Sequence, residues 1–356
     1  MRKAAAMLAG LGLLVFAQLA FGGAHQAATW DVAVGEQGKP PAGTPKGATL
    51  NQFFPAKLQI NAGDKVTFTA FGFHTVSYIA GKARPPLVGP AQGATYTGIN
   101  DSAGQPFYFD GQQAFSYNVA VFGPLGPKTV SGKTPASTGA IFATSPKKPA
   151  KATYTFPKVG AYKILCQVHP GMEMSVVVKP EGATVPSAED VAAKAKAETD
   201  IAWAKSKVLA AAKAPAGTVT MGIGGKTTIL DFLPAVTRVK VGATVRFVNR
   251  APSEPHNVGL GPRKYIEKFM KQTDLFPMGP GSKNQVTPVF VYGSDPRGTA
   301  YDGANHGNGF YATSLTDDQR GGLPNSASIT FTAPGKYHFI CLIHGPDMAA
   351  DIVVTK

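Results

Sequence analysis

The chain contains an internal repeat, and this repeat limits its possible folds more than any other feature. Residues 53–68 read FFPAKLQINAGDKVTF, and residues 232–247 read FLPAVTRVKVGATVRF. The Pro-Ala pair, a glycine and the Val-x-Phe ending occupy equal positions in the two segments. A second pair of matching segments, residues 154–179 and 329–354, surrounds the only two cysteines. Repetition on this scale predicts two structural units of one kind within the 356 residues.

Each unit has the side-chain alternation of a β protein. Apolar and polar residues alternate around a glycine turn in residues 57–71 and 237–249, and they alternate again before each cysteine. The 41 glycines and 29 prolines fit the many turns of such a fold. We therefore predict an all-β protein made of two β-sandwiches, in residues 29–182 and 217–356.

Residues 187–214 lie between the two units and favour a helix that joins them. Ser187 can cap the helix with Asp190 three residues later, alanine, lysine and glutamate follow, and Pro215 and Gly217 end it. We expect a helix over roughly 188–213. Its larger apolar side chains predict packing along a domain; they are Val191, Ile201, Val208 and Leu209.

Each unit also has a long middle section rich in Gly, Pro, Asn and Ser, over roughly 80–150 and 260–325. Loops of this length in a compact domain are functional or contain short strands that the pattern does not resolve. Residues 262–273, PRKYIEKFMKQT, favour a short helix.

The N-terminus resembles a secretory signal. Arg2 and Lys3 precede an apolar stretch and small residues that end before residue 25, which predicts a signal peptide over residues 1–24. An uncleaved anchor helix is the alternative. We expect an exported protein, in the periplasm or on the extracellular face of the cytoplasmic membrane. No other apolar run is long enough to cross a bilayer.

The formal net charge is +14, and it remains +12 after Arg2 and Lys3 are removed with the signal. A strongly basic exported protein favours acidic or membrane-associated partners, including an anionic membrane or cell wall. Export and the scattered basic residues make nucleic acid an unsuitable partner.

The two cysteines share one local pattern. Cys166 is followed by His169 and Met172, and Cys341 is followed by His344 and Met348. Export permits a Cys166–Cys341 disulfide, but a disulfide does not explain why both cysteines have the same histidine and methionine neighbours. A thiolate, an imidazole and a thioether on one loop can instead bind a single metal ion.

A fourth ligand can come from the histidine that follows the Val-x-Phe strand in each repeat, His74 and His256. Two histidines, one cysteine and a weak axial methionine make up a type 1 copper centre, which transfers single electrons. Zinc is the competing metal, but its usual ligands are cysteine, histidine and carboxylate rather than thioether.

On these residues both repeats resemble the cupredoxins, the blue copper proteins, and CQVHPGM looks like the short ligand loop of amicyanin-type members. The resemblance implies two Greek-key sandwiches with one copper ion each. It implies His74, Cys166, His169 and Met172 as ligands in the first repeat, and the corresponding residues His256, Cys341, His344 and Met348 in the second. Met174 remains an alternative axial ligand, although the register to the last strand favours Met172; Glu173 is a more remote one.

The downstream histidine of each loop, His169 or His344, is expected to reach the surface through an apolar rim. Candidates for that rim are Phe71, Phe73, Pro170, Gly171 and Pro346. An electron would enter or leave there, or through the cysteine sulfur.

Two-domain copper enzymes and copper storage or delivery proteins are the alternative functions. An oxidase or nitrite reductase needs further histidine-bound copper, but the chain has seven histidines and two blue sites use four. The spare histidines are His25, His306 and His338; no His-x-His pair occurs, and no histidine adjoins either cysteine. We expect His306 to lie in a flexible loop and His338 on an outward face, and we predict an electron carrier rather than an enzyme.

Overall fold

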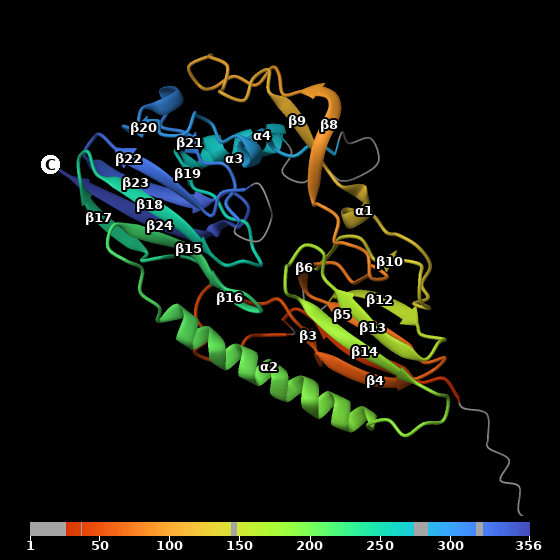
Figure 1. The fold of residues 1–356 in the computed structure, drawn as a ribbon. Helices are drawn as coiled ribbons and strands as arrows, with labels where there is room; N and C mark the ends of the chain where they lie inside the picture. Colours follow the sequence, from red (N-terminus) through yellow and green to blue (C-terminus); the bar gives the residue numbers. More distant parts are fainter. Residues whose placement is uncertain (1–25, 37, 144–147, 274–283, 318–322) are drawn as a thin grey trace, which may run out of the picture.

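The computed structural model describes residues 26–36, 38–143, 148–273, 284–317 and 323–356. It contains two β-sandwiches, and the helix α2 (Ala188–Ala210) runs along one side of both (Figure 1). The predicted all-β fold of two sandwiches joined by a helical linker is confirmed. The expected signal peptide and His25 lie outside the described residues. Within the described ranges, no helix has the length and apolar character needed to cross a membrane.

The first sandwich packs a four-stranded sheet, in the order β12-β5-β1-β3, against a five-stranded sheet, in the order β10-β7-β13-β14-β4. Alternate side chains of these strands, such as Val32, Phe68 and Val176, are fully buried in one apolar core between the sheets. The strands are β1 (Thr29–Val34), β3 (Phe53–Phe54), β4 (Lys57–Asn61), β5 (Lys65–Ala70), β7 (Ser77–Tyr78), β10 (Ala136–Ser137), β12 (Ala150–Thr155), β13 (Gly160–Leu165) and β14 (Glu173–Lys179).

The second sandwich repeats this topology. Its sheets have the orders β2-β16-β15-β18-β22-β20 and β17-β24-β23-β19-β21. The parallel pair β1–β5 recurs as β15–β18, and the parallel pair β14–β4 recurs as β24–β17. The strands are β2 (Ala48–Leu50), β15 (Thr218–Gly224), β16 (Thr227–Leu233), β17 (Val236–Lys240), β18 (Thr244–Arg250), β19 (Gly259–Leu260), β20 (Ala300–Tyr301), β21 (Tyr311–Ala312), β22 (Ser326–Phe331), β23 (Gly335–Cys341) and β24 (Gly345–Thr355).

The two repeats share elements across their interface. Strand β2 belongs to the first repeat but pairs with β16 of the second. Helix α2 packs Ala202 and Trp203 against Leu50 and Phe54 of the first repeat. Ile201, which was expected to pack, is 70% exposed.

That expectation was wrong for Val208 as well, which is also exposed. The face of α2 that contacts the protein consists of mainly small side chains around Trp203, and these let the helix approach closely. Of the four residues expected to pack, Val191 is buried in the first core, as predicted, and Leu209 is partly buried, so the large apolar residues indicated the buried face only in part.

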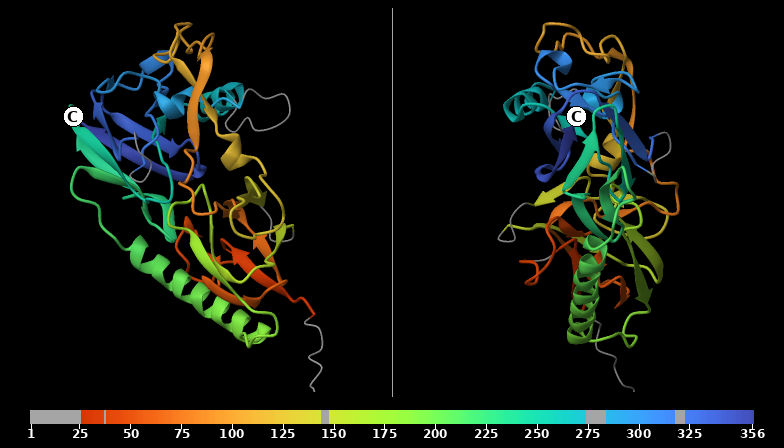
Figure 2. Two further views of the ribbon diagram at one scale, coloured as in Figure 1. Left: turned by 45° about the vertical axis from the view of Figure 1, so that its right-hand side comes forward. Right: turned by 90° about the vertical axis from the view of Figure 1, so that its left-hand side faces the viewer.

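The long middle sections form a third apolar core. The hairpin of β8 (Val88–Thr95) and β9 (Gln113–Tyr117), from the first repeat, lies beside α3 (Arg263–Thr273) and α4 (Pro288–Val291) of the second (Figure 2). The expected helix at 262–273 is thus present. The core consists mainly of aromatic residues; among them are Tyr96, Phe107, Phe109, Phe269, Phe290 and Phe310.

The remaining short elements lie in or next to the two middle sections. Strands β6 (Gly72–His74) and β11 (Ile141–Ala143) pair with each other, and the helix α1 (Val119–Phe122) lies between them in sequence. The 3-10 turn η1 (Asn305–Gly307) lies in the second repeat. The middle sections therefore contain the hidden short strands that their length suggested.

Candidate metal centres

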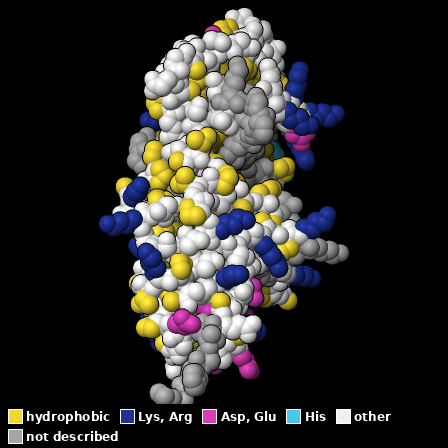
Figure 3. Space-filling view, turned by 90° about the vertical axis from the view of Figure 1, so that its right-hand side faces the viewer, with side chains coloured by type: hydrophobic (Ala, Val, Ile, Leu, Met, Phe, Trp, Pro, Cys, Tyr) yellow, Lys and Arg dark blue, Asp and Glu magenta, His cyan; other side chains and the backbone are white. Residues whose placement is uncertain are grey.

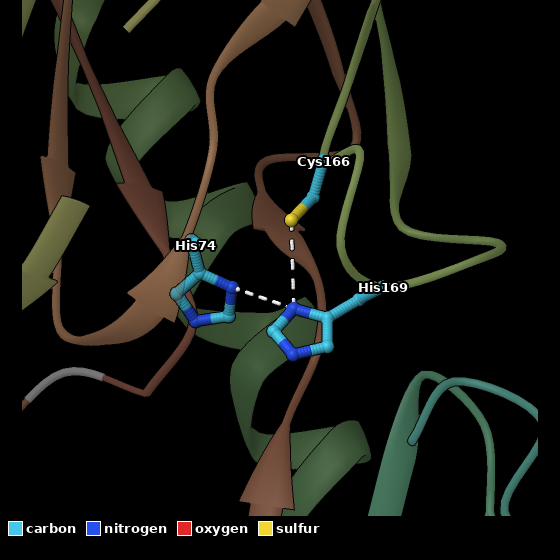
Figure 4. Close-up of side chains that lie close together, drawn as sticks. All are labelled: His74, Cys166 and His169. Carbon is cyan, nitrogen blue, oxygen red and sulfur yellow. Dashed lines mark hydrogen bonds between the residues drawn. The ribbon is translucent and has the colours of Figure 1, made fainter. Parts of the chain in front are cut away.

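The first candidate centre lies at one end of the first sandwich. His74 ends β6, Cys166 follows β13, and His169 lies in the loop that leads to β14 (Figure 4). The Nδ1 atoms of His74 and His169 are 3.1 Å apart, and Cys166 Sγ lies 3.4 Å from His169 Nδ1. All three residues are buried. The structure thus brings His74 together with two side chains, Cys166 and His169, that lie about 90 residues later in the chain.

The second candidate centre repeats this arrangement. Cys341 Sγ lies 3.4 Å from His344 Nδ1 and 3.8 Å from His256 Nδ1. The ring centroids of His256 and His344 are 4.8 Å apart, the same separation as those of His74 and His169. In each centre the nitrogen nearest the sulfur is Nδ1, so both rings present the same edge to a common point.

The donor atoms of each centre fit one metal ion. Ligand atoms of each group lie within 4.8 Å of one another. Metal–nitrogen bonds of about 2 Å and metal–sulfur bonds of about 2.3 Å place ligand atoms about 3–4 Å apart around one ion. The chemistry of the set, two imidazoles and a thiolate, suits copper or zinc.

The positions of the methionines distinguish copper from zinc as the bound metal only in part. Met172 and Met348 are completely buried, and both belong to the cores that contain the cysteines. The backbone of Met172 closes the ligand loop, because its carbonyl accepts a hydrogen bond from Cys166 N (3.0 Å). Met174 is also buried, but it lies within β14 opposite Ile164. Met172 therefore stays the better axial candidate, on its place in the loop.

Both cysteines are held as the ionised form that binds metals. Burial alone would raise the pKa of Cys166, but the charge of His169 and hydrogen bonds from both histidines lower that pKa well below its usual range. The pKa of Cys341 is lowered in the same way by His344 and His256. Burial lowers the pKa of His256, which favours the neutral imidazole that ligates metals.

Backbone and side-chain hydrogen bonds fix each cysteine loop. In the first centre Thr75 N donates to Cys166 Sγ (3.3 Å), and Gln167 N donates to Thr75 Oγ1 (2.7 Å). In the second centre Leu342 N donates to Asn257 Oδ1 (2.9 Å). The residue after the upstream histidine thus ties the two ligand segments together in both repeats.

Two glycines that sequence reasoning missed shape the centres. A Cβ on Gly35 would lie 2.4 Å from His74 Nε2, and a Cβ on Gly222 would lie 2.4 Å from His256 Nε2. Both glycines have left-handed φ angles, +76° and +62°. They therefore leave room for the upstream imidazole in each repeat. Their equivalent positions in the two repeats, after β1 and within β15, were the sequence signal that could have identified them.

The expectation that the downstream histidines reach the surface was wrong for His169, whereas the His344 side chain is partly exposed, at 16%. His169 is 6% exposed, because its Nε2 lies 3.2 Å from Glu254 Oε1 of the second repeat. His344 Nε2 lies 3.8 Å from the other oxygen, Glu254 Oε2. At the interface between the sandwiches Glu254 thus faces both ring edges, and the sequence had no signal for Glu254.

The charges at this interface are coupled. Burial alone would raise the pKa of Glu254, but His169 and His344 lower it well below its usual range. Burial lowers the pKa of His169, yet Glu254 and Cys166 together raise it to about 10. These shifts favour an ionised carboxylate that faces the Nε2 atoms of both rings.

The two remaining histidines within the described residues belong to neither centre. His338 pairs its Nδ1 with Asp351 Oδ1 (2.9 Å) on an exposed face, as expected. His306 does not lie free in a loop: its Nδ1 and Nε2 contact Asp101 Oδ2 (3.0 Å) and Asp295 Oδ2 (2.9 Å). Asp101 and His306 are 205 residues apart in the chain, so local sequence patterns could not predict this contact.

Comparison with known proteins gave one family match. Residues 219–355 match the model described as copper binding proteins, plastocyanin/azurin family. This range contains His256, Cys341, His344 and Met348. No curated protein matches the chain.

Several solved structures align with part of the chain. Oxidized plastocyanin from Dryopteris crassirhizoma is 17% identical and covers 39% of this chain and 99% of its own, with a TM-score of 0.21. Amicyanin from Paracoccus versutus is 20% identical and covers 41% of this chain and 88% of its own, with a TM-score of 0.20. These TM-scores are too low to support a conclusion about function. The functional interpretation rests on the family match and on the geometry of the two centres.

Proposed function

We propose, starting from the match of residues 219–355 to copper-binding proteins of the plastocyanin/azurin family, that this protein is an exported electron carrier with two type 1 copper sites. The observation that carries the proposal is the recurrence of a group of two histidines and one cysteine in both repeats, buried except for the partly exposed His344. In this proposal the ligands are His74, Cys166, His169 and Met172 in site 1, and His256, Cys341, His344 and Met348 in site 2.

Copper held by such a ligand set supplies a reversible one-electron couple between Cu(II) and Cu(I). The chain's own part is to hold the ligands so that little moves when the charge changes. The hydrogen bond from Thr75 N stabilises the charge on Cys166 Sγ. The buried sandwich core and the fixed loops restrict the ligand positions, which keeps rearrangement small.

A carrier accounts for the residues better than the alternatives do. A two-domain oxidase or nitrite reductase needs another copper bound by histidines between the domains. The chain lacks His-x-His pairs and a histidine beside either cysteine, and the described residues bring three metal-binding side chains together only at the two proposed sites. A storage or delivery protein needs open sites that exchange metal, whereas five of the six side chains in these two groups are buried and His344 is only partly exposed.

We also propose an acidic or membrane-associated redox partner, in keeping with the net charge of +14. Figure 3 shows a face on which hydrophobic side chains gather among scattered Lys and Arg side chains. Phe142 is 67% exposed, and its ring lies 6.1 Å from that of Phe73, next to His74. Since His169 is buried, this aromatic pair offers a contact near site 1.

A reductive titration tests the function directly. The copper-loaded protein should take up two electrons per chain and release them to ferricyanide, and repeated cycles should leave its spectrum unchanged. The rate with the anionic ferricyanide should fall as salt is added, because a basic surface attracts it. Turnover of nitrite or phenols would favour an enzyme instead, and loss of copper to a mild chelator would favour storage or delivery.

The contact near site 1 has its own test. Phe142→Ala should lower the rate of electron transfer to an acidic partner protein several-fold. Val159→Ala, which also removes an exposed apolar side chain but lies in the turn before β13, is the control and should leave that rate unchanged.

A further inference from the structure

The proposed ligands His169 and His344 turn their outer ring edges toward one carboxylate. His169 Nε2 lies 3.2 Å from Glu254 Oε1, and His344 Nε2 lies 3.8 Å from Glu254 Oε2. In each ring the opposite nitrogen, Nδ1, faces the cysteine sulfur. One carboxylate with two oxygens therefore lies between two metal-binding groups that belong to different repeats.

The carboxylate is held in this position by both repeats. Asn51 of the first repeat donates from Nδ2 to Glu254 Oε1 (2.8 Å). Asn249 donates from Nδ2 to the Glu254 carbonyl (2.8 Å), and Glu254 N donates to the Ala251 carbonyl (2.9 Å). Glu254 is 7% exposed and Asn51 is 2% exposed. A buried charge fixed by so many contacts is not a surface side chain that happens to lie near the sites.

We propose that Glu254 connects the two copper sites and is the route by which they exchange an electron; this inference rests on the proposed function. The route runs from one Cys-His group through the His169 ring and its Nε2–H, across the carboxylate, and through the His344 ring to the other. The step oxidises Cu(I) at one site and reduces Cu(II) at the other, so no bond is broken and no further reactant is needed. One site then needs contact with a partner, while the other stores an electron inside the molecule.

The charge of Glu254 has a second consequence. Each site is more positive when oxidised, so a buried negative charge between the sites stabilises the oxidised form of both. Removing that charge should raise both reduction potentials. This effect is separate from the rate of exchange and gives an independent measurement.

The test uses the full copper-loaded chain, three variants of Glu254 and Asn51, and two cysteine variants that supply reference spectra. A laser flash with a ruthenium photosensitiser reduces a small fraction of the copper, and transient absorption follows its redistribution between the sites. Reference spectra of each site come from Cys166→Ser and Cys341→Ser. We expect redistribution at a rate independent of protein concentration, slowed several-fold in Glu254→Gln and at least ten-fold in Glu254→Leu. Asn51→Ala, which frees the carboxylate, should slow it by a smaller factor.

The control is Glu198→Gln, which removes a negative charge from α2 that accepts a hydrogen bond from Ala56 N. It should change neither the rate nor the potentials. In the metal-free protein, the Nε2–H protons of His169 and His344 should exchange slowly with solvent in the parent and faster in Glu254→Gln, which checks the contacts without copper.

The outcomes separate this inference from the function. If both sites stay blue but Glu254→Gln and Asn51→Ala redistribute electrons within two-fold of the parent rate, the inference is overturned and the function stands. A parent rate that rises with protein concentration would overturn it too, because exchange would then occur between molecules. A parent protein without two blue sites would overturn both.

Discussion

At the scale of single residues, two glycines control the space around the upstream histidines. Gly35→Ala places a methyl group 2.4 Å from His74 Nε2, and Gly222→Ala places one 2.4 Å from His256 Nε2. Both distances are too short for the methyl group to fit. We expect each variant to weaken copper binding at its own site at least ten-fold, as loss of supporting contacts commonly does. Competition with a copper chelator measures the affinity of each site.

Backbone strain alone would also destabilise these variants, and the chain offers matched controls. Gly63 and Gly242 have φ angles of +93° and +84°, and a Cβ there would meet nothing within 4 Å. Gly63→Ala and Gly242→Ala should lower the free energy of unfolding by about 1 kcal/mol and leave copper affinity unchanged. Equal affinity losses in all four variants would contradict a role for the space beside the rings.

The axial position in site 1 can be settled by a pair of variants. Met172→Leu should change the visible and EPR spectra of site 1, because it removes the proposed weak sulfur ligand. Met174→Leu should leave both spectra unchanged. Each swap conserves volume and should cost less than about 1.5 kcal/mol of stability. The reverse result would assign the axial position to Met174.

The candidate site residues could be named from the sequence because each lies in a repeated local pattern. His74, Cys166 and His169 come together as that pattern indicated. Glu254 and the His306 contacts could not be named, since both depend on pairing between repeats, which leaves no trace in local spacing. The covered ring of His169 was missed for the same reason.

At the scale of elements, the packing of α2 gives a stability prediction. Trp203 is 5% exposed and packs on Leu50 and Phe54, whereas Ile201 is 70% exposed. Trp203→Ala should lower the free energy of unfolding by about 3–5 kcal/mol. Ile201→Ala should change it by about 0.5 kcal/mol or less. Denaturant unfolding measures both, and equal losses would contradict the packing of this helix.

The strands and the linker helix were predictable because their periods are local, with alternation in the strands and a capping box at Ser187. The exchange of β2 into the second sandwich and the shared aromatic core of the middle sections were not. Both depend on contacts between segments more than 100 residues apart, such as the pairing of Leu50 with Thr227. The composition of the middle sections, rich in Gly, Pro, Asn and Ser, predicted only long loops there.

At the scale of the whole molecule, His306 holds the middle sections of the two repeats together. It contacts Asp101 of the first repeat and Asp295 of the second. Burial alone would lower the pKa of His306, but hydrogen bonds and charge from these aspartates raise it. The pKa of Asp101 is lowered, by its hydrogen bonds to Gln105 N and His306 against the effect of burial.

These shifts predict how stability depends on pH. Because the folded protein keeps the His306 proton longer than the unfolded chain, the stabilisation is complete below about pH 6.5 and is lost as pH rises through the raised pKa. On the acid side it is lost as Asp101 becomes protonated. The difference in unfolding free energy between the parent and His306→Gln should therefore shrink above about pH 6.5. His338→Gln, at an exposed pair, is the control, and a difference that stays constant with pH would contradict the account.

The central claim is that one chain holds two type 1 copper sites, and copper analysis combined with optical and EPR spectra of the loaded protein tests it most directly. The account predicts two coppers per chain, an intense thiolate charge-transfer band near roughly 600 nm and two narrow-hyperfine Cu(II) signals, of which Cys166→Ser and Cys341→Ser each remove one. A colourless protein that binds zinc, or a single copper whose signal survives both substitutions, would contradict it.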